Sequence, residues 1–413
     1  MKANPIIKCR LCGSNNLTPI LSLGNQYISD FTPAPVEHGE KAPLDLVLCD
    51  RCYLLQLKHT FPKEPLYRNY WYASGINLTM KLALAEITLK AEQLVDLKEG
   101  DIVLDIGSND STLLRSYRTP GIKRVGFEPA KNLMAAAKME NGTIINNFFN
   151  HSDFTKNFGG SKAKVITSIA MFYDLEAPNA FVEDIKNTLD NDGIWINQLS
   201  YTPLMFDTNA FDNICHEHLE YYTLYSIEKL ISKHDLEVFD VETNDVNGGS
   251  FRLYLRHKNS RVKPTPGAET RVQKMRDYER LNGYQKIEVY RQFAERVTTL
   301  RKEIHDFIKQ KVDQGKKVYA YGASTKGNTL LQYCNLDHNL IAAAAERNPN
   351  KWGKYTVGTN IPIISEEQAR KEHPDFFLVL PWAFIKEFRE REEAFYKRGG
   401  KLIVPLPQIR VID

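Results

Sequence analysis

Residues 101–110 read DIVLDIGSND, and this stretch decides the fold. It is an apolar strand that runs into a polar loop with one glycine, as at the start of a nucleotide-binding α/β unit. We expect a helix from Ser111 and a second strand at 124–130, RVGFEPA, with Glu128 near its end. The sequence therefore predicts a strand, loop, helix and strand in the order that builds a parallel sheet.

The loop at 105–110 is the expected ligand contact, because ligands bind beyond the carboxyl ends of parallel strands. Gly107 lets the backbone approach a ligand, but Asn109 and Ser111 stand where a GxGxxG motif would have more glycines, which disfavours NAD. Glu128 lies 23 positions after Asp105, and its carboxylate can accept both hydroxyls of a ribose. This pattern is typical of an S-adenosylmethionine site; a structural loop with a solvated glutamate is the alternative.

The rest of the chain extends the α/β pattern in both directions. Strands expected at 164–171 and 193–200 flank a helix expected at 178–190. This alternation predicts a mainly parallel, doubly wound sheet. An amphipathic helix is expected near 79–97, and a long connecting helix at 284–312, where apolar residues recur every three to four positions. Beyond it, the segments KVYAYGAS, NLIAAAAE, DFFLVLPW and KLIVPLP predict a second, smaller α/β unit.

Four of the six cysteines form two CxxC pairs, which favours a metal site. The pairs are Cys9 with Cys12 and Cys49 with Cys52. Two such knuckles supply four thiolates to a tetrahedral zinc ion, and a full ligand shell makes the metal structural. A redox CxxC motif is the alternative. We therefore predict a zinc-binding module at 1–68, a Rossmann-like domain at 69–282 and a C-terminal Rossmann-like α/β domain at 283–413.

Residues 211–222, FDNICHEHLEYY, concentrate groups that can move protons. Histidine is the side chain best suited to remove a proton near neutral pH, and a carboxylate beside it can orient it. The HEH spacing places the two imidazoles at i and i+2, which does not fit the HExxH motif of zinc hydrolases. The segment therefore offers a general base; a charged surface loop is the alternative.

Two further features lie outside these segments. Tyr70 and Tyr72 flank Trp71 between the cysteine module and the first α/β unit, where they can line a cleft. YGASTKGNT at 321–329 resembles a phosphate loop, but Lys326 precedes Gly327, so the GxxxxGK[ST] motif is not satisfied. Backbone amides at this turn, with the lysine nearby, can still hold a diphosphate.

Composition excludes several classes of protein. The 413 residues include 54 Lys and Arg and 51 Asp and Glu, so the formal net charge is +3. This small surplus argues against nucleic-acid or anionic-membrane partners. Apolar runs such as 341–345 are far shorter than the roughly 20 residues of a membrane span. No signal-like apolar stretch precedes Cys9, so we expect a cytoplasmic protein. The oligomeric state is left open, and a monomer is compatible with the sequence.

Taken in order, CxxC…CxxC, YWYASG, LDIGSND, VGFEP, HEHLEYY, NGGSFR and YGASTKGNT resemble the three-domain S-adenosylmethionine-dependent sugar C-methyltransferases. The resemblance covers nearly the whole chain and is specific through the order of the motifs. Members of that family methylate C3 of nucleotide-linked 4-keto-deoxysugars, which gives branched-chain sugars. Two positions depart from the family pattern: Ser111 stands where a glycine commonly follows SND, and Cys215 where a tyrosine often precedes HEH.

The resemblance implies S-adenosylmethionine as methyl donor, structural zinc on the four cysteines and a nucleotide-linked keto-sugar as partner. His218 is the expected base at C3, Glu217 would orient it or the substrate, and Tyr72 would donate to the oxyanion or fix the sugar. Cofactor contacts are expected at Asp105, Gly107, Asn109, Asp110 and Glu128. Substrate contacts are expected at Tyr70, His216, Tyr222, Lys326 and Asn328.

Two rival functions stay open at this point. One is a methyltransferase of RNA or protein that uses the cysteine module for recognition, which requires a local basic face. The other is a non-enzymatic sensor of nucleotide sugars, in which both α/β units only bind. Titration with S-adenosylmethionine and a panel of nucleotide sugars would separate all three functions: the sensor binds sugars without turnover, and the RNA or protein enzyme ignores them.

Overall fold

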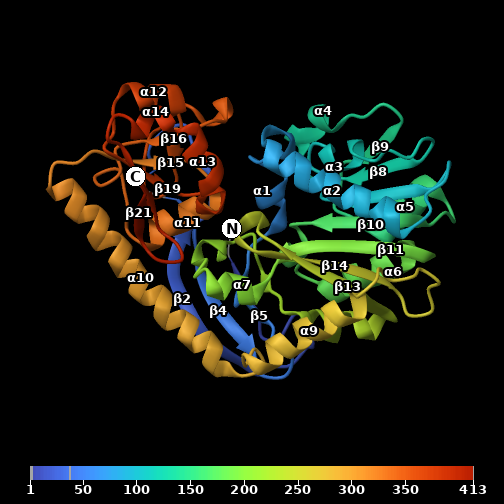
Figure 1. Ribbon diagram of the computed structural model, residues 1–413. Helices are drawn as coiled ribbons and strands as arrows, with labels where there is room; N and C mark the ends of the chain where they lie inside the picture. Colours follow the sequence, from blue (N-terminus) through green and yellow to red (C-terminus); the bar gives the residue numbers. More distant parts are fainter. Residues whose placement is uncertain (1–2, 37–38, 413) are drawn as a thin grey trace.

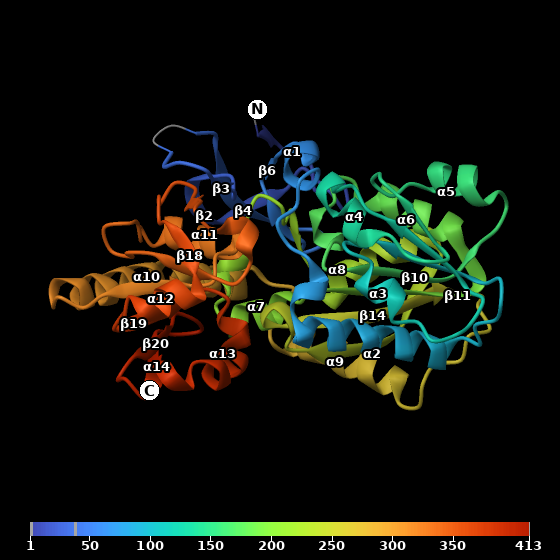
Figure 2. The same cartoon turned by 90° about the horizontal axis from the view of Figure 1, so that it is seen from above.

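The computed structural model describes residues 3–36 and 39–412. Figure 1 shows a central lobe, coloured cyan to yellow-green, beside a C-terminal lobe in orange and red. Seen from above, the N-terminal strands lie at the junction of these two lobes (Figure 2). The α/β class expected from the sequence, with a cysteine module, a Rossmann-like domain and a smaller C-terminal α/β domain, is confirmed.

The central sheet follows the expected alternation and then departs from it. Within the described residues it has seven strands in the order β13-β14-β11-β10-β7-β8-β9. The strands from β11 to β9 are parallel, whereas β13 and β14 form an antiparallel hairpin against β11 that the sequence pattern did not predict. Their bounds are β7 Ile102–Ile106, β8 Lys123–Phe127, β9 Gly142–Ile145, β10 Ala163–Ile169, β11 Leu189–Ser200, β13 Leu236–Asn244 and β14 Ser250–His257.

Helices cover both faces of this sheet because successive strand residues point to opposite sides. Leu104 packs in the apolar cluster of α6 and α8, whereas its neighbour Val103 packs in the cluster of α2. The expected long amphipathic helix near 79–97 is α2. The helices of this lobe are α2 Leu78–Leu94, α3 Thr112–Arg115, α4 Met134–Ala137, α5 His151–Phe158, α6 Pro178–Thr188, α7 Thr202–Asp207, α8 Leu224–Ile231 and α9 Ala268–Leu281.

The N-terminal module ties the two lobes together. Its sheet has the order β12-β5-β4-β2, so a strand from the central lobe, β12, completes a sheet of the module. A short strand of the module, β3, pairs with β17 of the C-terminal lobe. The bounds are β1 Asn4–Pro5, β2 Leu17–Tyr27, β3 Phe31–Thr32, β4 Lys41–Cys49, β5 Leu55–Leu57, β6 His59–Thr60, α1 Lys63–Tyr67, β12 Glu220–Tyr221 and β17 Tyr355–Thr356.

The C-terminal lobe repeats the parallel architecture on a smaller scale. Its sheet has the order β18-β16-β15-β19-β20-β21 in the described part of the chain, parallel except for β21. The expected connecting helix is α10, which runs along one side of this lobe (Figure 1). The bounds are α10 Ile287–Asp313, β15 Val318–Tyr321, α11 Thr325–Tyr333, β16 Ala344–Glu346, β18 Ile363–Ser365, α12 Glu366–Lys371, β19 Phe376–Val379, α13 Ile385–Arg391, α14 Glu393–Tyr396, β20 Lys401–Val404 and β21 Arg410–Ile412.

Both sheets contain a point where the strand order reverses, at β7 and at β15. Connections leave such a strand in opposite directions, which opens a crevice at its carboxyl end. The two crevices therefore mark where ligands should be sought. Across residues 3–36 and 39–412, no helix combines the length and apolar character needed to cross a bilayer.

Candidate active site

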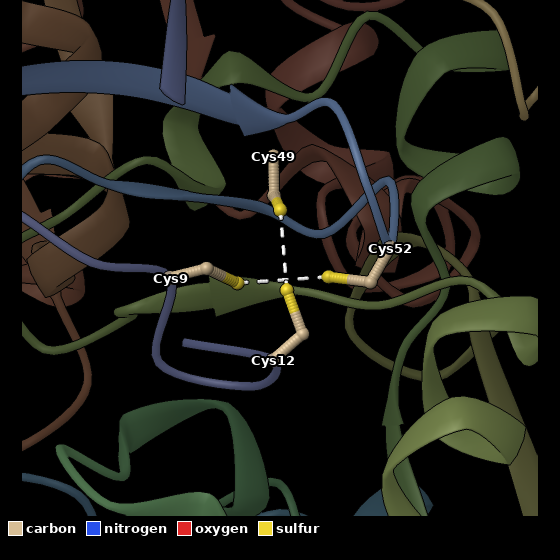
Figure 3. Close-up of side chains that lie close together, drawn as sticks. All are labelled: Cys9, Cys12, Cys49 and Cys52. Atoms are coloured by element: carbon tan, nitrogen blue, oxygen red, sulfur yellow. Dashed lines mark hydrogen bonds between the residues drawn. The ribbon is translucent and has the colours of Figure 1, made fainter. Parts of the chain in front are cut away.

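The four cysteines of the two CxxC pairs converge on one point (Figure 3). Their sulfur atoms all lie within 4.8 Å of one another, and the Cys9–Cys52 and Cys12–Cys49 pairs are 3.5 Å apart. Tetrahedral Zn–S bonds of about 2.3 Å place sulfur atoms roughly 3.8 Å apart, so this cluster fits zinc. Four thiolates complete the ligand shell, which makes the site structural.

Each cysteine pair is held by the same turn. The amide of Gly13 donates to the carbonyl of Cys9, and the amide of Tyr53 donates to that of Cys49, both at 2.9 Å. The two turn residues have positive φ angles, +73° at Gly13 and +54° at Tyr53. The glycine in CRLCG is thus suited to its position because it adopts a left-handed conformation without strain.

The first crevice is built around the β7 loop. Gly107, at φ +71°, turns the chain at the end of β7, and Asn109 follows at φ +52°. Glu128, just after β8, accepts the amide of Asn109 on one carboxylate oxygen and the amide of Ala130 on the other, both at 2.7 Å. Each oxygen keeps a lone pair for a further donor, so the carboxylate can accept the two hydroxyls of a ribose.

Two aspartates of this loop have different surroundings. Asp105 is buried in β7, and the hydroxyl of Thr167 donates to it at 2.6 Å. Burial raises the pKa of Asp105 to about 7. Asp110 accepts the amide of Gly75 at 2.7 Å, so it fastens the 72–75 segment over the loop. Asp105 lines the crevice, whereas Asp110 does not.

The crevice is a cavity of about 660 Å³, which we call the β7 cavity. That volume is in the range of small-molecule sites. Its lining includes Gly107, Asn109 and Glu128 of the cofactor loop region together with His218 and Lys326. Aromatic and thioether side chains also line it: Phe127, Phe148, Phe149, Met171 and Tyr173. The donor set and the glycine turn fit an adenosyl group.

His218 is the one partly accessible residue in the run from Ala210 to Leu224, all of which the structure describes. Its Nδ1 lies 2.8 Å from the carbonyl oxygen of Asn213, so Nδ1 carries the proton and donates it. Nε2 is left as the basic nitrogen. The ring of Tyr173 packs edge-on at 4.3 Å between centroids. Burial, with the charge of Lys326 as a second cause, lowers the pKa of His218 to about 3.

Glu217 lies in a second cavity, of about 610 Å³, at the end of β15. We call it the β15 cavity. The side chain of Glu217 is buried, and its Oε2 has no hydrogen-bond partner among the described residues. Burial raises the pKa of its carboxyl. The carbonyl of Asn213 orients His218, and Glu217 lines the β15 cavity, which His218 does not line.

The two cavities lie next to each other and share part of their lining. Six residues line both of them: Tyr70, Tyr72, Ser324, Thr325, Pro381 and Phe384. The junction thus combines the 70–72 segment of the linker with the loop after β15. Tyr72 is 44% exposed there.

The β15 cavity contains the same arrangement as Glu128 in the β7 cavity, a carboxylate that accepts two backbone amides. Glu346, which ends β16, accepts the amides of Ala323 and Asn348, both at 2.8 Å. Lys351 lies 3.6 Å from the same carboxylate. Arg347 and Arg391 also line the cavity, so it offers cations as well as an acceptor for hydroxyl groups.

Four other residues expected at the site lie away from both cavities. His216 donates through Nε2 to the carbonyl of Ala42 at 3.1 Å, and burial lowers its pKa to about 4. Tyr222 is fully buried with its ring against Phe172. Asn328 is buried and donates to the carbonyl of Asp30 at 3.3 Å. Asp110, as described above, fastens the linker.

Sequence reasoning did not single out the acidic residues Asp174 and Asp212, which line the β7 cavity, or Glu346, which lines the β15 cavity. Glu346 closes the second strand of its unit as Glu128 does, so the same reasoning could have found it. Asp174 ends a short 3-10 turn after β10, where no periodic pattern marks a side chain.

Comparison with known families agrees with this architecture. A zinc-binding domain model matches residues 9–67, a methyltransferase domain model matches 78–241, and a C-methyltransferase C-terminal domain model matches 245–407. The C-methyltransferase NovU of Streptomyces niveus is 31% identical over 418 residues, covering 99% of this chain and 97% of NovU.

Solved methyltransferase structures match part of the chain. The plantazolicin methyltransferase BpumL in complex with SAH is 14% identical, with a TM-score of 0.35, over 42% of this chain and 82% of BpumL. Magnesium protoporphyrin IX methyltransferase (ChlM) of Synechocystis PCC 6803 with bound SAH is 11% identical, with a TM-score of 0.35, over 44% of this chain and 88% of that one.

The cofactors follow from the family and from the residues present. The N-terminal module binds structural zinc through its four cysteines. The central domain uses S-adenosylmethionine, which supplies a methyl group activated by a positively charged sulfur. The chain belongs to the family of S-adenosylmethionine-dependent C-methyltransferases that join a zinc-binding domain, a methyltransferase domain and a C-terminal C-methyltransferase domain.

Proposed function

We propose that this C-methyltransferase acts on C3 of a nucleotide-linked 4-keto-deoxysugar and makes a branched-chain sugar. We place the reaction in the cytoplasm, where the cysteines of the zinc site stay reduced. The proposal rests on one observation above all. A histidine that lines the cavity of the cofactor loop has its Nδ1 proton committed to the carbonyl of Asn213, which leaves Nε2 as its basic nitrogen.

The chemistry follows from the acidity of carbon next to a ketone. Nε2 of His218 takes the C3 proton, and the electron pair of the C–H bond becomes a C3–C4 double bond with negative charge on the C4 oxygen. C3 is then the nucleophile that receives the methyl group, and the C4 ketone forms again. The low pKa of His218 keeps the imidazole unprotonated at neutral pH.

The adjoining cavities support a long, charged substrate. The sugar would lie at the junction, fixed by Tyr70 and Tyr72, with Glu217 on the side of the C-terminal lobe. Lys351, Arg347 and the carboxylate of Glu346 supply partners for phosphate and ribose in the β15 cavity. A base inside a cavity suits a small molecule better than a folded RNA or protein, which favours the sugar over the rival methyltransferase substrates.

The test is exchange of the C3 proton with deuterated solvent. His218→Asn keeps a donor for the carbonyl of Asn213 but has no basic nitrogen. We expect exchange to fall at least 100-fold, the usual contribution of a general base, while binding of S-adenosylhomocysteine stays within about threefold. Proton NMR of a panel of 4-keto-deoxysugar nucleotides measures the exchange, and calorimetry measures the binding.

A matched variant controls for general damage. His373→Asn changes an exposed histidine whose φ of +48° suits asparagine, so exchange should stay at the wild-type rate. Unchanged exchange in His218→Asn would reject the histidine as the base. Absence of exchange in the wild-type enzyme with every sugar of the panel would reject the proposed substrate class.

A further inference from the structure

Lys326 lies in a different place from the one its sequence motif indicates. It follows β15 in the first turn of α11, where a phosphate loop would hold a diphosphate. In the structure, however, it lines the β7 cavity with His218, Gly107 and Met171. It does not line the β15 cavity, which has its own cations. The lysine is therefore on the side of the reacting centre rather than that of the nucleotide.

Buried acidic groups surround this lysine. Burial lowers the pKa of Lys326, and the charges of Asp212, Cys215 and Asp174 oppose that drop. Asp212 is itself held in place, because Nε1 of Trp382 donates to its Oδ2 at 3.0 Å. Asp174 also lines the cavity. The fold thus holds an amine inside the cavity near two acidic side chains from separate turns, whose charges offset part of the effect of burial on the pKa of the lysine.

The proposed reaction needs a positive partner at this point. Removing a proton from C3 leaves negative charge on the C4 oxygen, and His218 is too weak a base to do this unless that charge is stabilised. Among the described residues that line the β7 cavity, the cationic side chains are Lys63 and Lys326. Lys63 is exposed and its ammonium lies over the ring of Phe148, 4.3 Å from the centroid. Lys326 is the cation whose charge reaches His218.

We propose that Lys326 is a catalytic residue whose ammonium donates to the C4 oxygen of the substrate and stabilises the enolate made by His218. This inference rests on the proposed function. When the C3–H bond breaks, the proton goes to Nε2 of His218 and the electron pair moves to the C4 oxygen, where the ammonium meets it. When C3 bonds to the methyl group, the methyl–sulfur bond of the donor would break with its electron pair left on sulfur, which gives S-adenosylhomocysteine; the charge then leaves the C4 oxygen and the ketone returns.

The same geometry separates this role from a phosphate-binding role. An oxyanion partner acts in the transition state, so its loss lowers the exchange rate at saturating substrate. A phosphate-binding lysine instead holds the nucleotide in every state, so its loss weakens affinity. The two roles therefore predict opposite effects on rate and binding.

The experiment compares Lys326→Met and Lys326→Gln with the wild-type enzyme. It measures C3 exchange in deuterated water at saturating keto-sugar with S-adenosylhomocysteine present, and the affinity for the matching nucleoside diphosphate. We expect exchange to fall about 100- to 1,000-fold, as for other oxyanion partners, and diphosphate affinity to stay within threefold. Zinc content and S-adenosylhomocysteine binding identify folded variants, and either folded variant decides the question.

Each outcome has one meaning. Exchange at the wild-type rate in a folded variant overturns the inference and leaves the proposed function intact. Weaker diphosphate affinity with an unchanged exchange rate at saturation overturns it in favour of phosphate binding. No exchange in the wild-type enzyme itself overturns the proposed function, and the role of Lys326 with it.

Discussion

Single side chains decide what the β7 cavity can do. In the run HEH, His216 faces a carbonyl of the zinc module whereas His218 faces the cavity. Two residues of the same type, two positions apart, thus have a structural and a proposed catalytic role. Their difference is set by which backbone carbonyl each ring meets, Ala42 for the first and Asn213 for the second.

The pH dependence of exchange tests the state of His218. Its pKa is lowered to about 3, so the imidazole stays neutral as the pH falls from 8 to 5 and remains able to accept a proton. We therefore expect that protonation of His218 does not lower the exchange rate between pH 8 and pH 5. A histidine with an ordinary pKa of about 6.5 would lose roughly tenfold by pH 5.5.

The profile needs two controls, because burial also raises the pKa of Asp174 and raises that of Asp105 to about 7 in the same cavity. Initial exchange rates are therefore measured in Asp174→Asn and in Asp105→Asn as well as in the wild-type enzyme, with circular dichroism to check the fold. An acid limb near pH 6.5 that persists in both variants would contradict the assigned state of His218.

Ser111 shows why a family position prefers glycine. Its φ is +63°, and its buried hydroxyl donates to the carbonyl of Ala137 at 2.9 Å. Ser111→Ala loses a hydrogen bond worth about 1 kcal/mol and keeps the strain. Ser111→Gly loses the same bond but gains about 1 kcal/mol from the relieved left-handed conformation. We expect the glycine variant to melt near the wild type and the alanine variant below it; the reverse order would refute this account.

At the level of elements, the zinc module positions the proposed base. Strand β12 follows His218 directly and pairs with β5, and the amide of Leu57 donates to the carbonyl of Leu219 at 2.9 Å. Strand β5 begins just after Cys52. The metal site and the base therefore share one small sheet, although the zinc takes no part in the chemistry.

Loss of zinc should consequently affect the base before the cofactor site. We expect Cys12→Ser to lose zinc and at least 100-fold in C3 exchange, while S-adenosylhomocysteine affinity stays within about threefold. The reason is that Glu128 and the β7 loop belong to the central sheet. Metal analysis, NMR exchange and calorimetry measure the three quantities.

The matched control is Cys334→Ala, which changes a buried cysteine outside the cluster. It should keep its zinc and its exchange activity. Full exchange activity in a zinc-free Cys12→Ser enzyme would show that the module does not position His218.

The sequence predicted local elements well and long-range contacts poorly. The CxxC spacing and the β7 loop followed by Glu128 are read from neighbouring residues, because knuckles and strand-to-helix turns are local structures. The pairing of β12 with β5 joins residues far apart in the chain, and nothing in HEHLEYY shows it. The inward direction of His218, and the placement of Lys326 beside it, likewise depend on tertiary packing.

At the scale of the whole molecule, the three parts enclose the site together. One apolar cluster contains Leu46 of the module, Phe211 of the central lobe and Leu330 of the C-terminal lobe. Trp382 of the C-terminal lobe donates to Asp212 of the central lobe at 3.0 Å. The two cavities lie side by side at this seam, and the proposed substrate would bind across it.

The account stands on the claim that a ring carbon receives the methyl group. The most direct measurement supplies S-adenosylmethionine with a ¹³C-labelled methyl group and a 4-keto-deoxysugar nucleotide, and examines the product by NMR. We predict a labelled methyl group bonded to C3 of the sugar. A label on oxygen or nitrogen, or transfer only to RNA or protein, would contradict the account.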